Sequence, residues 1–184
     1  EGNFGLYITS EMPVKTLPEF IAYAKANPGK VNYASSGIGS IVHLVTEDFR
    51  IRANLDLVHV PFKGIAETIP EILANRVQAV FSDTTIMQPH IDSGKMRLLA
   101  VGAKARLKSM PTVPTFEEAG MAGFTPTFWI GLYAPRGTPP VAMDRLNSEV
   151  KAILTQPAMQ QQFTDRGYHT IWMATADGQQ KVAD

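Results

Sequence analysis

The sequence predicts an α/β protein with an open, mostly parallel sheet and flanking helices. Short apolar runs of strand length alternate with amphipathic stretches of helix length along most of the 184 residues. Hydrophobic residues make up 45% of the chain, which is enough to bury a substantial core. Because open sheets of this kind bind ligands beyond the carboxyl ends of their strands, the loops that follow strands are the first candidates for a site.

Composition narrows the classes of function. Seventeen Lys and Arg residues balance seventeen Asp and Glu residues, so the chain lacks the basic excess of a nucleic-acid-binding protein. There is no cysteine, and the four histidines, His43, His59, His90 and His169, do not stand at metal-ligand spacings. We therefore expect no metal, no cofactor and no nucleic-acid partner. No apolar run approaches the roughly 18–20 residues that cross a membrane as a helix.

The chain begins with a strand and a capped helix. Residues 5–9 read as a strand. Thr16 and Glu19 stand three residues apart in a capping-box pattern, which predicts a helix that starts after Thr16 and stops at the Asn-Pro-Gly sequence 27–29.

Residues 32–49 combine a short strand, a Ser/Gly loop and an amphipathic helix. Ser or Gly fills five of the six loop positions 35–40, and the helix is expected from Ile41. Its apolar residues recur at helical spacing: Ile41, Leu44, Val45 and Phe49. Such a loop exposes backbone N–H groups, and a carboxylate or phosphate at the helix start gains roughly 0.3–1 kcal/mol. The loop therefore predicts a small-anion site; the alternative is a plain N-cap at Ser40 with nothing bound.

Several named motifs are absent from this loop. Gly39-Ser40 is followed by Ile41 rather than by the Lys-Ser/Thr end of a phosphate loop, and Val42 stands where a dinucleotide fingerprint needs glycine. There is no Gly-x-Ser-x-Gly elbow, and Ser40 and His43 are too close on one helical turn to serve as nucleophile and base. We expect a binding protein; an α/β hydrolase-like enzyme or a small-molecule sensor remains the alternative.

Three more strands and two helices are expected next. Residues 57–61, 77–81 and 96–101 read as strands. A helix over residues 65–74 contains Pro70, which should kink it or divide it into two pieces. A short helix is expected over residues 86–92.

Four residues near strand ends are further candidates for the site, each with a structural alternative. His43 could bind the ligand or pack the helix start. Phe62 could offer an aromatic wall, and Lys63 could offer a cation or be merely solvated. Asp83 could accept a hydrogen bond from a ligand or cap the next helix. His59 alternates with valines in a strand and reads as a packed or edge residue. The loops 35–40, 62–64 and 82–85 all follow strands and should share one edge.

The last third is less regular. A short helix at residues 115–120, an extended aromatic segment at 124–134 and helices at 140–154 and 157–166 are expected. Residues 168–173 could form a last strand, and residues 174–184 could begin a helix or fray.

Motifs along nearly the whole chain carry a family resemblance. They are Asn27-Pro28-Gly29-Lys30-Val31-Asn32-Tyr33-Ala34-Ser35-Ser36-Gly37-Ile38-Gly39-Ser40, His59-Val60-Pro61-Phe62-Lys63-Gly64, Pro111-Thr112-Val113-Pro114-Thr115-Phe116-Glu117-Glu118-Ala119-Gly120 and Trp129-Ile130-Gly131-Leu132-Tyr133-Ala134-Pro135-Arg136-Gly137-Thr138-Pro139. In this order they resemble the periplasmic solute-binding receptors of tripartite tricarboxylate transporters, also called Bug receptors.

The resemblance implies a periplasmic-binding-protein-like fold of type II and a two-domain clamp. Such a receptor captures a small mono-, di- or tricarboxylate in the periplasm, after removal of a signal peptide, and delivers it to the membrane components of the transporter. The resemblance assigns residues 1–127 to the second domain and 128–184 to a return into the first. The family's carboxylate loop maps onto Ser35, Ser36, Gly37, Gly39 and Ser40, and Asp83 falls where contacts to the variable part of the ligand occur.

The sequence also departs from the family pattern. The family's other carboxylate loop, which is Gly-rich and ends in Asp, has no counterpart here, so the resemblance predicts that most of the first domain and half of the cleft are absent. Apolar surface on residues 124–139 and on the last helices should then be exposed, which predicts self-association. Pro70 and Asn75 stand where an uninterrupted helix ending in Gly is the usual pattern.

Overall fold

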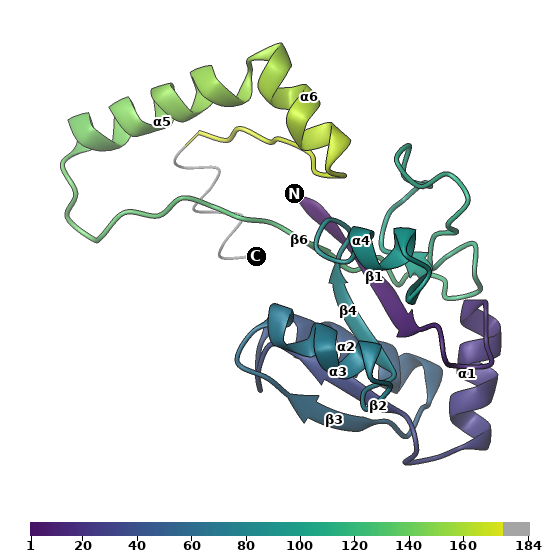
Figure 1. Ribbon diagram of the computed structural model, residues 1–184. Coiled ribbons are helices and arrows are strands. Elements are labelled where there is room, and N and C mark those ends of the chain that lie inside the picture. The colour runs from purple at the N-terminus through teal and green to yellow at the C-terminus, as the bar shows by residue number, and fades with distance from the viewer. Residues whose placement is uncertain (175–184) are drawn as a thin grey trace. The chain divides into compact units, whose positions relative to one another are not determined.

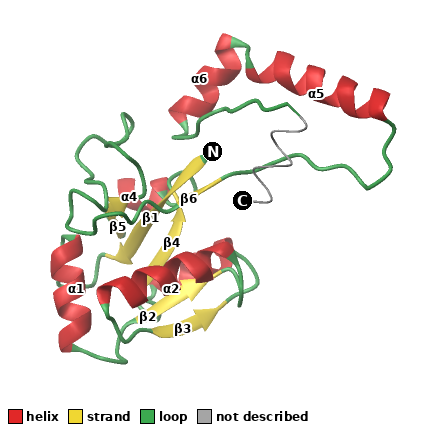
Figure 2. Cartoon of the chain, turned by 180° about the vertical axis from the view of Figure 1, so that it is seen from behind, coloured by secondary structure: helices red, strands yellow, loops and turns green. Residues whose placement is uncertain are grey.

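A computed structural model describes residues 1–174 and divides the chain into two compact units (Figures 1 and 2). The larger unit is Asn3–Thr127, and the smaller one contains Glu1–Gly2 and the chain from Phe128 onward. The larger unit holds a sheet with flanking helices, and the smaller one holds two helices and extended segments. No helix among the described residues combines the length and the apolarity needed to cross a bilayer.

The sheet of the larger unit has the strand order β3-β2-β4-β1-β5, with a short β6 paired to β1. The strands are β1 (Gly2–Thr9), β2 (Asn32–Ser35), β3 (Val58–Pro61), β4 (Ala79–Asp83), β5 (Met96–Val101) and β6 (Thr127–Phe128). β2 is parallel to both β3 and β4, whereas β1 is antiparallel to β4 and β5. The expectation of an open α/β sheet is confirmed. The expectation of a mostly parallel one needs correction, because β1, which lies between β4 and β5, runs against both neighbours.

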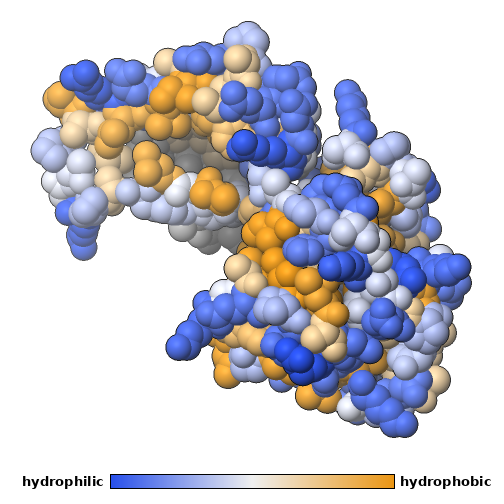
Figure 3. Space-filling model, in the orientation of Figure 1, coloured by the Kyte–Doolittle hydropathy of each residue, from blue (hydrophilic) through white to orange (hydrophobic). Residues whose placement is uncertain are grey.

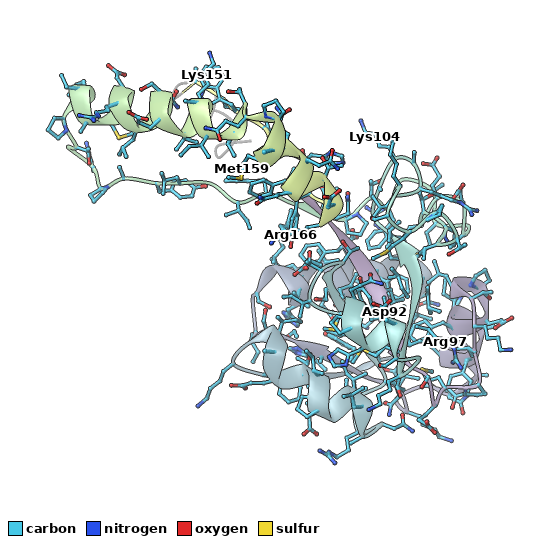
Figure 4. All side chains as sticks on the ribbon, turned by 45° about the horizontal axis from the view of Figure 1, so that its top comes forward. Asp92, Arg97, Lys104, Lys151, Met159 and Arg166 are labelled. Carbon is cyan, nitrogen blue, oxygen red and sulfur yellow. The ribbon has the colours of Figure 1, made fainter. Side chains whose placement is uncertain are left out.

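β1 is longer than the sequence predicted, since it begins at Gly2 rather than at Gly5. All eight of its residues are buried, and its register with β4 pairs Phe4 with Asp83 and Ile8 with Ala79. Arg97 on β5, labelled in Figure 4, donates from Nη1 to the carbonyls of Met12 at 3.0 Å and Val14 at 3.1 Å. These bonds tie the segment that leaves β1 to the strand beside it.

Helix α1 (Leu17–Ala26) has the predicted N-cap. Thr16 Oγ1 accepts from the Glu19 N–H at 3.3 Å, and Glu19 Oε2 accepts in return from the Lys15 N–H at 2.7 Å. The helix is held to the unit by Leu17, Phe20 and Ala24, all buried. The capping residues and the buried apolar side chains therefore indicate the same helix, starting after Thr16.

Helix α2 (Ile41–Ala53) starts where predicted but buries a different face. Val42, Thr46 and Phe49 are its buried residues, while Ile41 and Leu44 are 51% and 59% exposed. The predicted apolar stripe is therefore rotated away from the buried face of the helix, because hydrophobic spacing alone does not assign a threonine such as Thr46 to the core. Thr46 can be buried at little cost, since its hydroxyl donates to the Val42 carbonyl at 2.7 Å.

A cluster of four phenylalanines packs α2 against the sheet. Phe49 lies 5.5 Å from Phe81 on β4 between ring centroids, and Phe116 and Phe124 complete the cluster with centroid separations of 4.9–6.3 Å. Full burial of one such side chain is worth about 1.5–3 kcal/mol in transfer free energy. The cluster therefore fixes the helix whose N-terminus carries the Ser/Gly loop.

The expected helix over residues 65–74 is divided, as the proline predicted, into a 3-10 turn η1 (Ile65–Glu67) and helix α3 (Thr68–Leu73). Helix α4 (Gln88–Asp92) is shorter than expected. Residues 115–120 form turns rather than a helix. There Thr115 Oγ1 accepts from the Glu118 N–H at 3.1 Å, so the capping pattern stabilises a turn without a helix behind it.

The smaller unit contains helices α5 (Pro140–Leu154) and α6 (Pro157–Asp165), close to the predicted bounds. Within residues 1–174, no residue of either helix is buried, and Ile130, Leu132 and Val141 are 85%, 75% and 80% exposed. Figure 3 shows apolar side chains on the surface of this unit.

Residues 168–173 do not form the expected strand. The backbone of His169 exchanges hydrogen bonds of 2.7 and 2.8 Å with Glu1, and the Tyr168 N–H donates to the Phe163 carbonyl at 2.9 Å. The segment is held to α5 by Trp172, whose Nε1 donates to Asn147 Oδ1 at 3.1 Å and whose ring lies 4.0 Å from Lys151 Nζ. Lys151 is labelled in Figure 4. The expected tail falls, apart from Ala174, outside the described residues.

Candidate carboxylate site

The Ser/Gly loop leaves the carboxyl end of β2 and enters α2, as Figure 2 shows. β2 pairs in parallel with β3, Ser35 opposite Pro61, and with β4, Ala34 opposite Val80. The three strands therefore end at the same edge of the sheet. The loop after β3 lies beside the Ser/Gly loop, because the Phe62 N–H donates to the Ser35 carbonyl at 3.0 Å.

Two glycines give the loop its path. Gly37 and Gly39 have φ angles of +124° and +78°, a region that side chains with a Cβ rarely adopt. A Cβ on Gly37 would meet the Phe62 carbonyl at 3.5 Å, an ordinary contact, so backbone conformation rather than space selects glycine there.

The start of α2 leaves hydrogen-bond donors open. Ser40 is the N-cap, and its Oγ accepts from the His43 N–H at 3.3 Å. Within the described residues, the backbone N–H groups of Ser36 and Ile38 and the Ser36 hydroxyl have no protein partner. The capping alternative is therefore realised at Ser40 without using up the donors that an anion would need.

Ser35 differs from the rest of the loop because it is completely buried. Its Oγ lies 3.2 Å from both the N and the O of Gly37 and 2.6 Å from His59 Nε2. A hydroxyl has one proton and two lone pairs, so these three contacts can satisfy it fully. Its predicted contact with a ligand stays a prediction, and that contact would have to replace an internal bond.

Three stacked rings lie under the loop. Between ring centroids, His59 is 4.8 Å from Tyr33 and 4.2 Å from His43, with interplanar angles of 14° and 18°. His43 Nδ1 accepts from the Gly39 N–H at 3.2 Å, so this ring contacts the loop directly. At the other end of the stack, the Tyr33 hydroxyl donates to Glu47 Oε1 at 2.6 Å, and Glu47 pairs with Arg50 at 2.8 Å.

Burial and these partners shift three pKa values. Burial, and then the bond to Glu47, raises the pKa of the Tyr33 hydroxyl, which stays a donor. The bond from Arg50 lowers the pKa of the Glu47 carboxyl. Burial, with neighbouring His43 as a second cause, lowers the pKa of His59. Burial therefore favours the uncharged form of the His59 ring, and an ion pair closes one end of the stack.

The sequence did not point to His59, which it assigned to packing or an edge. The signal that could have found it is strand register, because Tyr33 and His59 are paired residues of β2 and β3, and Ser35 is on the same face as Tyr33. Register is a tertiary property, and periodicity in one strand does not supply it.

The remaining predicted residues lie at the same edge or on its turns. Phe62 is half-buried and Lys63 is exposed, with the Lys63 backbone N–H donating to Glu67 Oε2 at 3.2 Å. Asp83 Oδ1 accepts from the N–H groups of Thr85 at 2.9 Å and Ile86 at 3.2 Å, so it caps the turn before α4. Ligand roles for all three stay predictions. No His, Asp and Glu cluster suited to a metal ion occurs among residues 1–174.

A surface cavity of this unit lies elsewhere. It has a volume of about 580 Å³ and is lined at the C-terminal ends of α1 and α2 by Ala24, Lys25, Pro28, Arg50, Asn54, Leu55 and Asp56. None of the predicted site residues lines it.

Comparison with known proteins decides the family. Residues 1–184 match the TctC family, described as the tripartite tricarboxylate transporter family receptor. The chain belongs to this family. Among curated relatives, Protein BugT of Bordetella pertussis is 31% identical over 172 residues, which cover 94% of this chain and 52% of BugT. A protein of Cupriavidus necator described as "UPF0065 protein in gbd 5'region" is 37% identical over 155 residues, covering 84% of this chain and 47% of that one.

Solved structures agree with this assignment. "R. palustris Rpa4515 with adipate" is 29% identical, with a TM-score of 0.94, and the match covers 99% of this chain and 61% of the other. MatC from Rhodopseudomonas palustris with bound malate is 30% identical, with a TM-score of 0.82 over 90% of this chain and 56% of MatC. The periplasmic-binding-protein-like fold is thereby confirmed. The chain spans about half the length of the curated relatives it matches.

Proposed function

We propose that this member of the TctC family binds a small carboxylate through the Ser/Gly loop, as part of a periplasmic solute-binding receptor. The observation that carries the proposal is the group of unpartnered donors at Ser36 and Ile38, directly before a 13-residue helix. A carboxylate placed there accepts from backbone N–H groups and meets the positive end of the helix dipole.

Two further observations support an organic acid as ligand. The chain has no net charge, so a local array of backbone donors accounts for anion binding better than a general electrostatic field does. Two structural neighbours of 29% and 30% identity carry adipate and malate in their descriptions. A mono-, di- or tricarboxylate is the corresponding ligand class for this chain. Residues 1–127 would form the ligand-binding domain and residues 128–184 the return into the first domain.

Family membership extends the proposal to location and partners. A receptor of this family would work in the periplasm and hand its ligand to the membrane components of a tripartite tricarboxylate transporter. These roles belong to the whole receptor.

One contact gives the enzymatic alternative a specific basis. Ser35 Oγ and His59 Nε2 are 2.6 Å apart, the distance of a nucleophile and its general base. However, Ser35 has no exposed surface, so a substrate carbonyl cannot reach its oxygen in this conformation. The pair is better explained as a structural bond, and we assign no catalysis to it. Ester or amide hydrolysis that disappears in Ser35→Ala or Ser40→Ala would overturn the receptor proposal.

The proposal is tested by calorimetry and thermal unfolding with adipate and malate, using dimethyl adipate as the uncharged control. A ligand at 100 times its Kd should stabilise the chain by about 2.7 kcal/mol. Ser36→Asp places a carboxylate among the donors and should abolish binding, and the Ser36→Ala/Ser40→Ala pair should weaken it. Ser93→Asp, an exposed serine after α4, is the matched control. Equal binding of the acids by Ser36→Asp and Ser93→Asp would show that the binding site is not in this loop.

A further inference from the structure

The ring stack suggests how the Ser/Gly loop is kept in shape before any ligand arrives. Two backbone amides of the loop are hydrogen-bonded to residues of the stack or to a direct partner of it. The Gly37 N–H donates to Ser35 Oγ, which contacts His59, and the Gly39 N–H donates to His43 Nδ1. His59 lies at the centre, 2.6 Å from the Ser35 oxygen and stacked on the His43 ring. It therefore contacts both supports of the loop while lying on a different strand.

Hydrogen-bond counting assigns the proton on His59. Ser35 Oγ accepts from the Gly37 N–H, which leaves one lone pair and one proton for the Gly37 carbonyl and His59 Nε2. If His59 Nε2 accepted, the Ser35 proton would point to the ring and its contact with the Gly37 carbonyl would be lost. All three contacts are satisfied together when His59 Nε2–H donates and the Ser35 hydroxyl donates to Gly37.

We propose that His59 is a positioning residue for the carboxylate loop, acting through Nε2–H on Ser35 and through its ring on His43 without touching the ligand. The proposal rests on the carboxylate function proposed above, which it deepens by naming what orders the donors. Ordered donors cost less on binding than a loop that must be immobilised by the ligand.

The surroundings keep His59 in the required form. The titratable groups facing it are Tyr33 from β2, and His43 and Glu47 from α2, while Arg50 pairs with Glu47. Tyr33 remains a neutral donor, Glu47 is neutralised by Arg50, and burial favours an uncharged His59 ring. A neutral ring with its proton on Nε2 is therefore the stable state near pH 7.

Two substitutions separate the two actions of His59. His59→Phe keeps a ring for stacking and removes the donor. His59→Gln keeps an N–H near the Nε2 position and removes the ring. His90→Phe, on α4, is the matched control for loss of a histidine. If His59 had only a structural role, His59→Phe and His59→Gln would both act by lowering the stability of the fold. The presence of an N–H donor in one of them would then make no difference to the loop.

Two measurements without ligand test the proposal. Hydrogen exchange of the Gly37 and Gly39 amides reports how firmly the loop is held, and NMR of the imidazole nitrogens locates the proton on His59. His59→Phe should accelerate Gly37 exchange about two- to tenfold, the worth of one hydrogen bond, while His59→Gln retains protection there and loses it at Gly39. Adipate and malate affinity should fall by a similar factor in His59→Phe and stay unchanged in His90→Phe.

Each outcome decides between the two proposals. Unchanged Gly37 exchange in His59→Phe, a proton on His59 Nδ1 alone, or unaltered affinity despite a released Gly37 would overturn the positioning role. If the wild-type chain binds neither acid but His59→Phe still releases Gly37, the carboxylate function fails for this chain and the ordering of the loop by His59 stands.

Discussion

Helices α2 and α5 show how differently two amphipathic segments can end up in one chain. α2 buries Val42, Thr46 and Phe49 against the sheet of the larger unit. α5 is longer, at 15 residues, yet none of its residues is buried by the described part of the chain. The sequence predicted both helices. Burial, which supplies most of a helix's stability in a protein, depends on what lies opposite the apolar face.

The largest expected effect comes from the core beside α2. Phe49→Ala removes a fully buried ring that contacts Phe81, Phe116 and Phe124, and should cost about 3–5 kcal/mol in the free energy of unfolding. Leu146→Ala on α5, at a side chain 46% exposed, should change it by less than about 0.5 kcal/mol. Urea denaturation followed by circular dichroism measures both. Similar costs for the two substitutions would mean that α5 is packed in solution.

A second, smaller effect is expected from pH and is confined to the larger unit. His59 has a lowered pKa in the folded chain, so the unfolded chain binds its proton more readily. Stability should therefore be full above the ordinary histidine pKa of about 6.5 and decline as pH falls below it. Glu47, whose pKa is lowered by Arg50, adds a separate decline as pH falls below the ordinary glutamate pKa of about 4.3.

Melting temperatures from pH 8 to 5 measure the histidine part. His59→Phe should make the melting temperature nearly independent of pH in that range. The separate fall at lower pH should remain, because Glu47 is unchanged. His90→Phe serves as the control and should follow the wild-type curve. A wild-type profile that stays level from pH 7 to 5.5 would contradict the assignment.

The smallest effect on stability is expected in the smaller unit, where the change should appear in association. Val141 is 80% exposed, so Val141→Glu should alter the unfolding free energy by less than about 0.5 kcal/mol. The same charge on an exposed apolar helix face should lower self-association of the chain, measured as mean mass by light scattering at increasing concentration. Asp144→Glu on the same helix is the control. A clean monomer at every concentration would refute the predicted self-association.

Much of the site was readable in the sequence because it depends on neighbours in the chain. Ser40 as N-cap and the start of α2 at Ile41 are local features, and they were predicted from residue type and spacing. The role of Ser35 could not be predicted from the sequence, because one of its three contacts is with His59, which is 24 positions away. For Asp83 the sequence left a cap and a ligand contact open; the bonds to Thr85 and Ile86 establish the cap, and the ligand contact stays a prediction.

By itself, the sequence determined the bounds of α1, α5 and α6 and the start of α2, and it predicted which loop could hold an anion, because caps, prolines, glycines and hydrophobic spacing act within a few residues. The tertiary structure alone decided that β1 runs antiparallel between β4 and β5, and that Thr46 rather than Leu44 faces the core. It alone brought His59 under the loop, through the pairing of β2 with β3. Strand order, register and buried face are set by contacts between distant segments, whose free energy no local pattern contains.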